Sequence, residues 1–343
     1  MRKKFFCAVI SVFLFVTILL IGCDEKKRRD ARILLGGIAG SLSQSPLFQK
    51  DMPFHKRYKW NAEDFFNDPQ IIVLCKAIEA QDLREIDRLI AGGTDVNALG
   101  KDNMTPLLWA FPTQNLAVFT KILEAGADPN VQITSDFGVN LGNDTRIETG
   151  TSVMELVAST IHTGFFEAVM RHGGDPNLVS KVSGMPDAPL NSIAKHWDSQ
   201  SRVGRIEHAR LLLNAGADIN AVSCHGTPII TAVQNRQIDL AIFLLEAGAD
   251  WENEPETLEF VTREGIHYTR KPPTLLQEVA NLEENLPPHW TDVQRGTFDK
   301  LVMLLKEKGA GPELDRLREE NEQARQIRSE IDAQRARSTQ THH

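Results

Sequence analysis

A short motif that returns at a nearly constant interval constrains this chain more than any other feature. The motif centres on glycine followed by aspartate. It recurs from Asp95 to Asp128, and again from Asp218 to Asp250, at a spacing of about 33 residues, which is typical of proteins built from stacked supersecondary units. The five copies lie at residues 91–97, 125–130, 172–177, 215–220 and 247–250, and all but the last end in asparagine.

A second motif accompanies the first and predicts where helices begin. Residues 105–110 are Thr-Pro-Leu-Leu-Trp-Ala, and residues 227–232 are Thr-Pro-Ile-Ile-Thr-Ala. Threonine caps a helix N-terminus, and proline is tolerated in the first turn. The following helix in each repeat is expected to end at a glycine such as Gly126 or Gly248, because glycine adopts the left-handed conformation readily. Each repeat is therefore predicted to be a pair of helices.

The predicted second helices carry apolar residues along one face, for example in residues 116–123 and 240–245. Neither helix of a pair can bury such a stripe alone, so the repeats are expected to stack into one continuous core. A weaker sixth pair, at about residues 273–280 and 298–305, is predicted to cap the stack.

With both motifs in register, residues 70–312 resemble the ankyrin-repeat family. The resemblance implies an all-α solenoid of five to six helix-pair repeats with inserted loops. The third repeat departs from the family pattern because it starts Thr-Ser-Val-Met at Thr151, and the fourth lacks threonine before Pro189. Insertions in repeat proteins form loops, often on the binding face. The longest are at residues 133–148, 181–205 and 253–271.

The N-terminus predicts export. Three basic residues at 2–4 precede an apolar stretch at residues 5–21, and Leu-Ile-Gly-Cys ends at Cys23. This is the pattern of an export signal. Its end resembles the lipobox of bacterial lipoproteins, which implies lipidation of Cys23. The alternative is an uncleaved transmembrane anchor, because the apolar stretch reaches the short end of the spanning range and residues 26–29 are basic.

These features divide the chain into four expected parts. Asp24 follows the lipobox cysteine and resembles an inner-membrane retention signal, so we expect a lipid-anchored protein of the cell envelope that faces the periplasm, with the inner membrane favoured over the outer. The expected parts are a lipoprotein signal peptide at 1–22, a lipid-anchored tether at 23–59, an ankyrin-repeat domain at 60–312, and a charged C-terminal helix and tail at 313–343.

Charge and cysteine content exclude several classes of protein. The formal net charge is −8, and removing the three basic residues of the leader makes it −11. Nucleic-acid binding needs a cationic surface, so no nucleic-acid partner is expected. Cys75 and Cys224 lie in different repeats, too far apart for an intramolecular disulfide.

The sequence contains no recognisable catalytic motif. It has no phosphate-binding loop, no nucleophile elbow and no His-Glu-x-x-His, and its ten histidines lack ligand spacing. The adjacent Cys224 and His225 would suit an activated thiol, but their place in a predicted hairpin favours a turn. We therefore expect no enzyme activity, no metal, no cofactor and no small-molecule substrate.

Ankyrin-repeat proteins bind partners through hairpin tips and the exposed face of the first helices, so the resemblance implies a protein partner there. Trp109 is the strongest candidate because large aromatic residues are enriched at binding hot spots. The alternative is that Trp109 packs under the insertion at residues 133–148. The predicted partner-binding residues are Lys76, Glu79, Trp109, Phe111, Glu155, His225, Gln234 and Asn235.

The whole architecture resembles immunity proteins that neutralise antibacterial effectors of type VI secretion, some of which are phospholipases. The expected function is thus a membrane-anchored periplasmic module that binds and occludes a toxic effector encoded nearby. The alternative is a general envelope scaffold with resident partners. Acidic residues in the last long insertion, among them Glu252 and Glu256, would suit a basic partner surface.

Overall fold

The computed structural model describes residues 53–142, 145–160, 163–180, 186–195, 202–261 and 265–340. The predicted signal peptide, Cys23 and most of the predicted tether lie outside these residues. The chain divides into two compact units, Met1–Asn61 and Ala62–His343. Among the described helices, none is long and apolar enough to cross a bilayer.

The described part of the first unit is a small aromatic cluster. It contains α4 (Phe54–Arg57), a single helical turn. The Phe54 ring packs edge-on against Trp60, with centroids 5.2 Å apart, and tilts against Tyr58 at 4.6 Å. The Trp60 N–H also donates to the His55 carbonyl at 2.8 Å.

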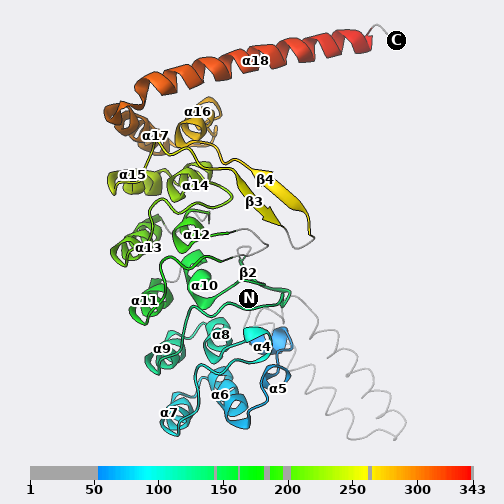
Figure 1. Ribbon diagram of the computed structural model, residues 1–343, viewed down its shortest axis with the longest axis vertical. Helices are drawn as coiled ribbons and strands as arrows, with labels where there is room; N and C mark the ends of the chain where they lie inside the picture. The colour runs from blue at the N-terminus through cyan, green and yellow to red at the C-terminus, as the bar shows by residue number, and fades with distance from the viewer. Residues whose placement is uncertain are drawn as a thin grey trace, which may run out of the picture. The chain divides into compact units, whose positions relative to one another are not determined.

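The second unit is a stack of helix pairs in two columns (Figure 1). This arrangement confirms the predicted stacking of helix pairs, including the sixth pair. A short helix, α5 (Ala62–Phe65), precedes the first pair. The inner column consists of α6 (Pro69–Ala80), α8 (Pro106–Ala110), α10 (Val153–Ser159), α12 (Pro189–Lys195), α14 (Pro228–Gln234) and α16 (Leu275–Glu284). The outer column consists of α7 (Leu83–Ala91), α9 (Leu116–Glu124), α11 (Thr163–Arg171), α13 (Arg202–Asn214), α15 (Ile238–Glu246) and α17 (Asp292–Leu305).

The inner helices begin much as the sequence predicts. The Thr105 side chain accepts a hydrogen bond from the Leu108 N–H at 3.1 Å, and Pro106 occupies the first turn of α8. Thr227 makes no such capping bond, although Pro228 starts α14 as expected. In the third repeat the cap is Ser152, which accepts from the Glu155 N–H at 3.1 Å. The helix therefore starts one residue later than Thr151 suggested.

The turns that end the outer helices use glycine in the left-handed region, as predicted. Gly126 and Gly248 have φ values of 92° and 99°. A side chain at either position would be strained even though the space beside each glycine is open. These turns lead directly into the loop that contains the repeated asparagine.

The repeated asparagines link each repeat to the next by an asparagine ladder. Asn97 donates from Nδ2 to the Gly126 carbonyl at 2.8 Å, and its Oδ1 accepts from the Asp128 N–H at 2.7 Å. Each rung thus joins two repeats through one side chain. The same pair of bonds runs from Asn130 to Gly173 and Asp175, and from Asn177 to Gly216 and Asp218.

The asparagine ladder ends at the fifth repeat. Asn220 accepts from the Asp250 N–H at 3.0 Å, which is the last rung. Glu252 then occupies the place of the next asparagine. The sixth helix pair joins the stack by packing, α16 against α14 and α17 against α15.

Two insertions contain β-hairpins instead of the irregular loops that we expected. In the first, β1 (Val139–Gly142) pairs antiparallel with β2 (Thr145–Ile147). In the last, β3 (Leu258–Val261) pairs antiparallel with β4 (His267–Arg270). The β3–β4 hairpin projects from the stack on the side of the inner helices (Figure 1).

The stack ends in a long charged helix, α18 (Gly311–Gln340). Leu314 and Leu317 are buried, and this part of α18 lies against α16. Further along, Ile327 and Ile331 are exposed. Only the first turns of α18 therefore contribute to the core.

Candidate protein-interaction surface

A stack of helix pairs would leave one side of its inner helices open to a partner, but much of that side is covered here. Trp109, which we expected to face a groove, is the fourth residue of α8, and α10, α12 and α14 each have an equivalent fourth residue. These residues are Trp109, Leu156, Ser192 and Thr231, and each is 2% exposed or less. In these four repeats, the position belongs to the protein interior.

Trp109 illustrates how the inner side is covered. Its ring packs edge-on against Phe65 and Phe66, with centroids 5.6 and 6.3 Å away, and its Nε1–H donates to Glu79 at 3.2 Å. Phe65 in turn packs against Phe137 from the first insertion at 5.5 Å. The prediction that Trp109 projects toward a partner is wrong, because the ring is buried beneath the aromatic residues that cap the first pair.

Phe111 is also buried, so it too is unavailable to a partner. Its exposed fraction is 1%, and its ring packs against Phe119 and Phe165 at 6.0 and 5.9 Å. These contacts join the second repeat to the third. The predicted binding role of Phe111 is corrected to a role in the core.

Glu155 belongs to a buried polar cluster rather than to a groove. Because α10 starts at Val153, Glu155 occupies the position of Leu108 in α8, and its Oε2 is buried. Burial, and next the charge of Asp187, raise the pKa of Glu155 to about 8, although nearby Lys195 lowers it. The side chain is therefore mostly protonated at neutral pH. Glu155 is half-buried, and its contact with a partner stays a prediction.

Asp187 and Lys195 complete this cluster, and neither was among the residues predicted from the sequence. The Lys195 Nζ donates to Asp187 at 2.7 Å, and the Ser192 hydroxyl donates to the same oxygen at 2.9 Å. The other carboxylate oxygen of Asp187 is buried with no partner among the described residues. The only signal in the sequence was a pair of ionisable residues flanking a short inner helix.

His225, Gln234 and Asn235 are half-buried and make internal hydrogen bonds. Gln234 donates to the His225 carbonyl at 3.2 Å and to Glu278 at 3.3 Å, and Asn235 donates to the Thr231 carbonyl at 2.9 Å. The Gln234 bonds tie the end of α14 to the loop before it and to α16, whereas the Asn235 bond lies within α14 and its C-cap. Whether any of the three also contacts a partner stays a prediction.

The adjacent Cys224 and His225 do not form an activated pair. Burial lowers the pKa of His225 to about 4, helped by the charges of Lys195 and Arg270. Cys224 is fully buried, and burial raises the pKa of its thiol. Nucleophilic chemistry needs the thiolate form, which this environment disfavours.

The two predicted residues of the first inner helix differ in exposure. Lys76 is exposed and pairs with Glu63, whereas Glu79 is half-buried and accepts from Trp109. An exposed ion pair contributes little to stability. Lys76 is thus the predicted site residue that remains fully on the surface.

A row of exposed side chains lies instead at the tips of the loops between repeats. Leu99, Val179 and Val222 are 60%, 49% and 40% exposed. Each follows a ladder asparagine by two positions, so they are equivalent residues of three repeats. In the remaining repeat the position is Gln132, which donates to the Val179 carbonyl at 2.9 Å. We call these four residues the hairpin-tip row. Their fixed distance from the ladder asparagine could have identified them from the sequence, but they were not among the predicted site residues.

The β3–β4 hairpin adds a second exposed apolar surface, which we call the arm. Val261, Ile266 and Tyr268 are 44%, 45% and 48% exposed. Tyr268 stacks on Phe260 of the paired strand, with centroids 5.8 Å apart and ring planes 14° apart. Tyr268 lies opposite Phe260 and Val261 lies on the other face, so the arm exposes apolar side chains on both of its faces.

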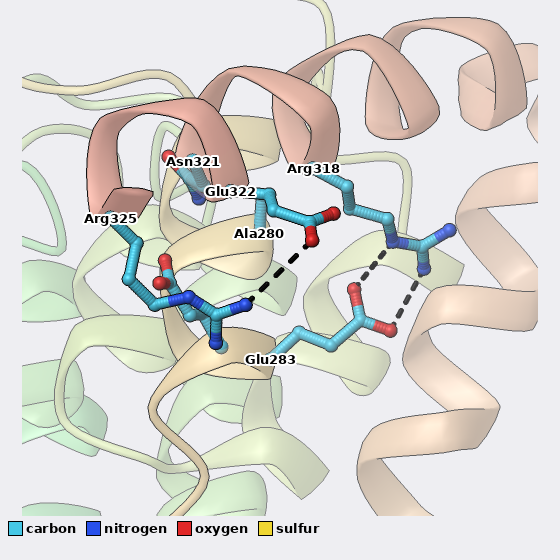
Figure 2. A pocket seen from close by; sticks show the side chains of 7 residues that line it. Ala280, Glu283, Arg318, Asn321, Glu322 and Arg325 are labelled. Carbon is cyan, nitrogen blue, oxygen red and sulfur yellow. Dashed lines mark hydrogen bonds and ion pairs between the residues drawn. The ribbon is translucent and has the colours of Figure 1, made fainter. Parts of the chain in front are cut away.

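The groove between α16 and α18 is lined mainly by charged side chains (Figure 2). Its volume is about 260 Å³. Arg318 from α18 makes a bidentate pair with Glu283 at 2.7 and 2.8 Å, and Arg325 lies 3.9 Å from Glu322. The Arg318–Glu283 pair joins α18 to α16, whereas the Arg325–Glu322 pair lies within α18. Within the described residues, no cluster of His, Cys, Asp and Glu side chains is suited to hold a metal ion.

Comparison with known proteins gives a likeness in fold alone. No family model matches the chain, and no curated protein matches its sequence. Among solved structures, the chain is similar to the crystal structure of the ankyrin repeat domain of Bcl-3, described as a unique member of the IkappaB protein family. The TM-score is 0.46 and the identity 19%, over 68% of this chain and 85% of that chain.

Proposed function

We propose that this chain is a protein-binding module without catalytic activity, and that the hairpin-tip row and the arm form its binding surface. The observation that carries the proposal is the recurrence of exposed aliphatic residues at one position of the first, third and fourth repeats. Exposed apolar residues are normally scattered, and their recurrence at equivalent positions offers a partner a repeated contact. The side chains expected to line a groove are largely engaged inside the protein.

In the finer form of the proposal, the chain is an envelope-anchored immunity protein that binds and occludes a toxic effector. The export signal and the lipobox-like residues before Cys23 support anchoring at the membrane. Anchoring would hold the inhibitor where a membrane-directed toxin must act. A scaffold for resident envelope proteins would use the same surface but would bind several partners.

The first experiment tests the binding surface. Full-length tagged chain is purified from the envelope of its own host, and co-purifying products of neighbouring genes are quantified. We expect one stoichiometric partner, and we expect the double variant Leu99→Ser, Val222→Ser to lower its affinity by about tenfold or more. Val293→Ser is the matched control, because Val293 is 75% exposed on the outer helix α17. Equal loss in the control, or none in the double variant, would refute the proposed surface.

The second experiment separates the inhibitor from the scaffold. The gene is deleted in cells with and without the gene of the co-purified partner. An immunity protein predicts loss of viability only when the partner is present. A defect that persists without the partner would favour the scaffold, and release of the chain from membranes in Cys23→Ser would support the lipid anchor.

A further inference from the structure

The arm offers an open strand edge. β3 and β4 pair with each other through four residue pairs from Leu258↔Arg270 to Val261↔His267, and neither joins another strand in the described chain. Neither strand packs closely against a described helix. The outer edge of β3 therefore presents backbone N–H and C=O groups that can pair with another chain. A two-stranded hairpin is also marginally stable alone, so a third strand would stabilise it.

An acidic segment leads into this edge. It consists of Glu252, Glu254 and Glu256 before β3, and Glu259 within it, and all four are exposed. Glu254 lies 3.5 Å from Lys271. The other three carboxylates form no ion pair with a described residue. Their mutual repulsion would be relieved by positive charge from outside.

Apolar side chains alternate with the acidic ones along β3. Leu258 and Phe260 lie on one face of the strand and are half-buried, whereas Glu259 and Val261 lie on the other and are exposed. An added strand would place its own side chains beside these rows. The complementary sequence is an extended one in which lysine or arginine alternates with apolar residues.

We propose that the arm captures an extended basic segment of the partner protein, which adds as a third strand to the edge of β3. This inference rests on the proposed function and specifies the chemistry of the partner. Backbone pairing supplies affinity in such strand addition, and alternate side chains supply specificity.

The charges disfavour pairing between the β3 edges of two copies of this chain. Such pairing would bring Glu256 and Glu259 of both copies together. Like charges on adjacent strands are destabilising. A nucleic acid is disfavoured by the same carboxylates.

The test uses a defined probe and the full-length chain. The probe is a blocked, fluorescein-labelled ten-residue peptide of alternating lysine and valine, and binding is measured by fluorescence anisotropy. We expect the chain to bind it, and we expect the triple variant Glu252→Gln, Glu256→Gln, Glu259→Gln to weaken binding by about tenfold. The control replaces Glu307, Glu319 and Glu330 with glutamine, which changes the net charge equally outside the arm.

Two further readouts separate strand addition from simple charge attraction. A peptide of the same charge, N-methylated at every residue, cannot donate backbone hydrogen bonds to β3 from either edge and should bind at least about tenfold more weakly. Amide exchange at Leu258–Val261 should slow when the unmodified peptide binds.

The inference is overturned if the unmodified peptide does not bind, if the control triple variant weakens binding equally, or if N-methylation has no effect. These failures leave the proposed function untouched when a co-purified partner still depends on the hairpin-tip row. Conversely, peptide binding without any co-purified partner would count against the proposed function alone.

Discussion

Replacing Asn130 with alanine should weaken one boundary of the stack and leave the others intact. Asn130 donates to the Gly173 carbonyl at 2.8 Å and accepts from the Asp175 N–H at 2.8 Å. Its own N–H donates to Asp128, and that turn bond does not need the side chain. The substitution therefore removes only the rung between the second and third repeats.

The expected loss follows from the two hydrogen bonds. A typical intramolecular hydrogen bond contributes about 0.5–1.5 kcal/mol, so two contribute about 1–3 kcal/mol. Both bonds of Asn130 are exposed, and water can replace the missing partner. The loss in the free energy of unfolding should therefore fall at the lower end of that range, near about 1 kcal/mol.

Urea unfolding followed by circular dichroism measures this loss, and native-state amide exchange locates it. Faster exchange should appear at Gly173 and Asp175, because each repeat of a stack depends on its nearest neighbours. Asn285→Ala is the matched control, since the Asn285 side chain bonds only to the Asn281 carbonyl of its own helix at 2.9 Å. If Asn130→Ala costs no more than this control, the ladder does not couple the repeats.

Three other substitutions have expected outcomes. Glu155→Gln should stabilise the protein at neutral pH. Between pH 4.5 and about 8 the folded wild-type chain keeps a proton on Glu155 that the unfolded chain releases. The wild-type free energy of unfolding therefore falls by about 1.4 kcal/mol per pH unit relative to the variant, which gives a difference of about 3 kcal/mol at pH 7. Parallel stability curves for the two proteins from pH 4 to 8 would contradict this. Trp109→Ala should cost about 3–5 kcal/mol in urea unfolding, and a loss below about 1 kcal/mol would mean that the ring is not in the core. Arg318→Met should remove the partly exposed pair with Glu283 and cost about 1 kcal/mol, with faster proteolysis of α18; unchanged proteolysis would show that other contacts hold the helix.

The helix pairs could be predicted from the sequence because the signals that define them are local. Glycine at the end of each outer helix, proline at the start of α8 and α14, and the asparagine of each ladder rung all act within a few residues or on the adjacent repeat. The third repeat shows the limit of this reasoning. Thr151 and Ser152 both suit a cap, and only the fold decides that Ser152 is used.

The candidate site was harder to predict because it depends on what the insertions and the N-terminal cap cover. The burial of Trp109 depends on Phe65 and Phe66, which precede the whole first helix pair in the chain. The burial of Glu155 depends on a cluster with Asp187 and Lys195 from the next repeat. Residue type at a repeat position therefore predicted the helix correctly but not the solvent exposure of its side chain.

The end of the asparagine ladder at Glu252 also bears on how a chain of this kind can change over time. Each rung before it requires a matching loop in the following repeat, so the first five repeats are constrained to vary together. The segment from Glu252 onward, with the arm, the sixth pair and α18, has no rung to preserve. Substitutions in that segment are therefore not constrained by the ladder, although α16 and α17 must still pack against α14 and α15.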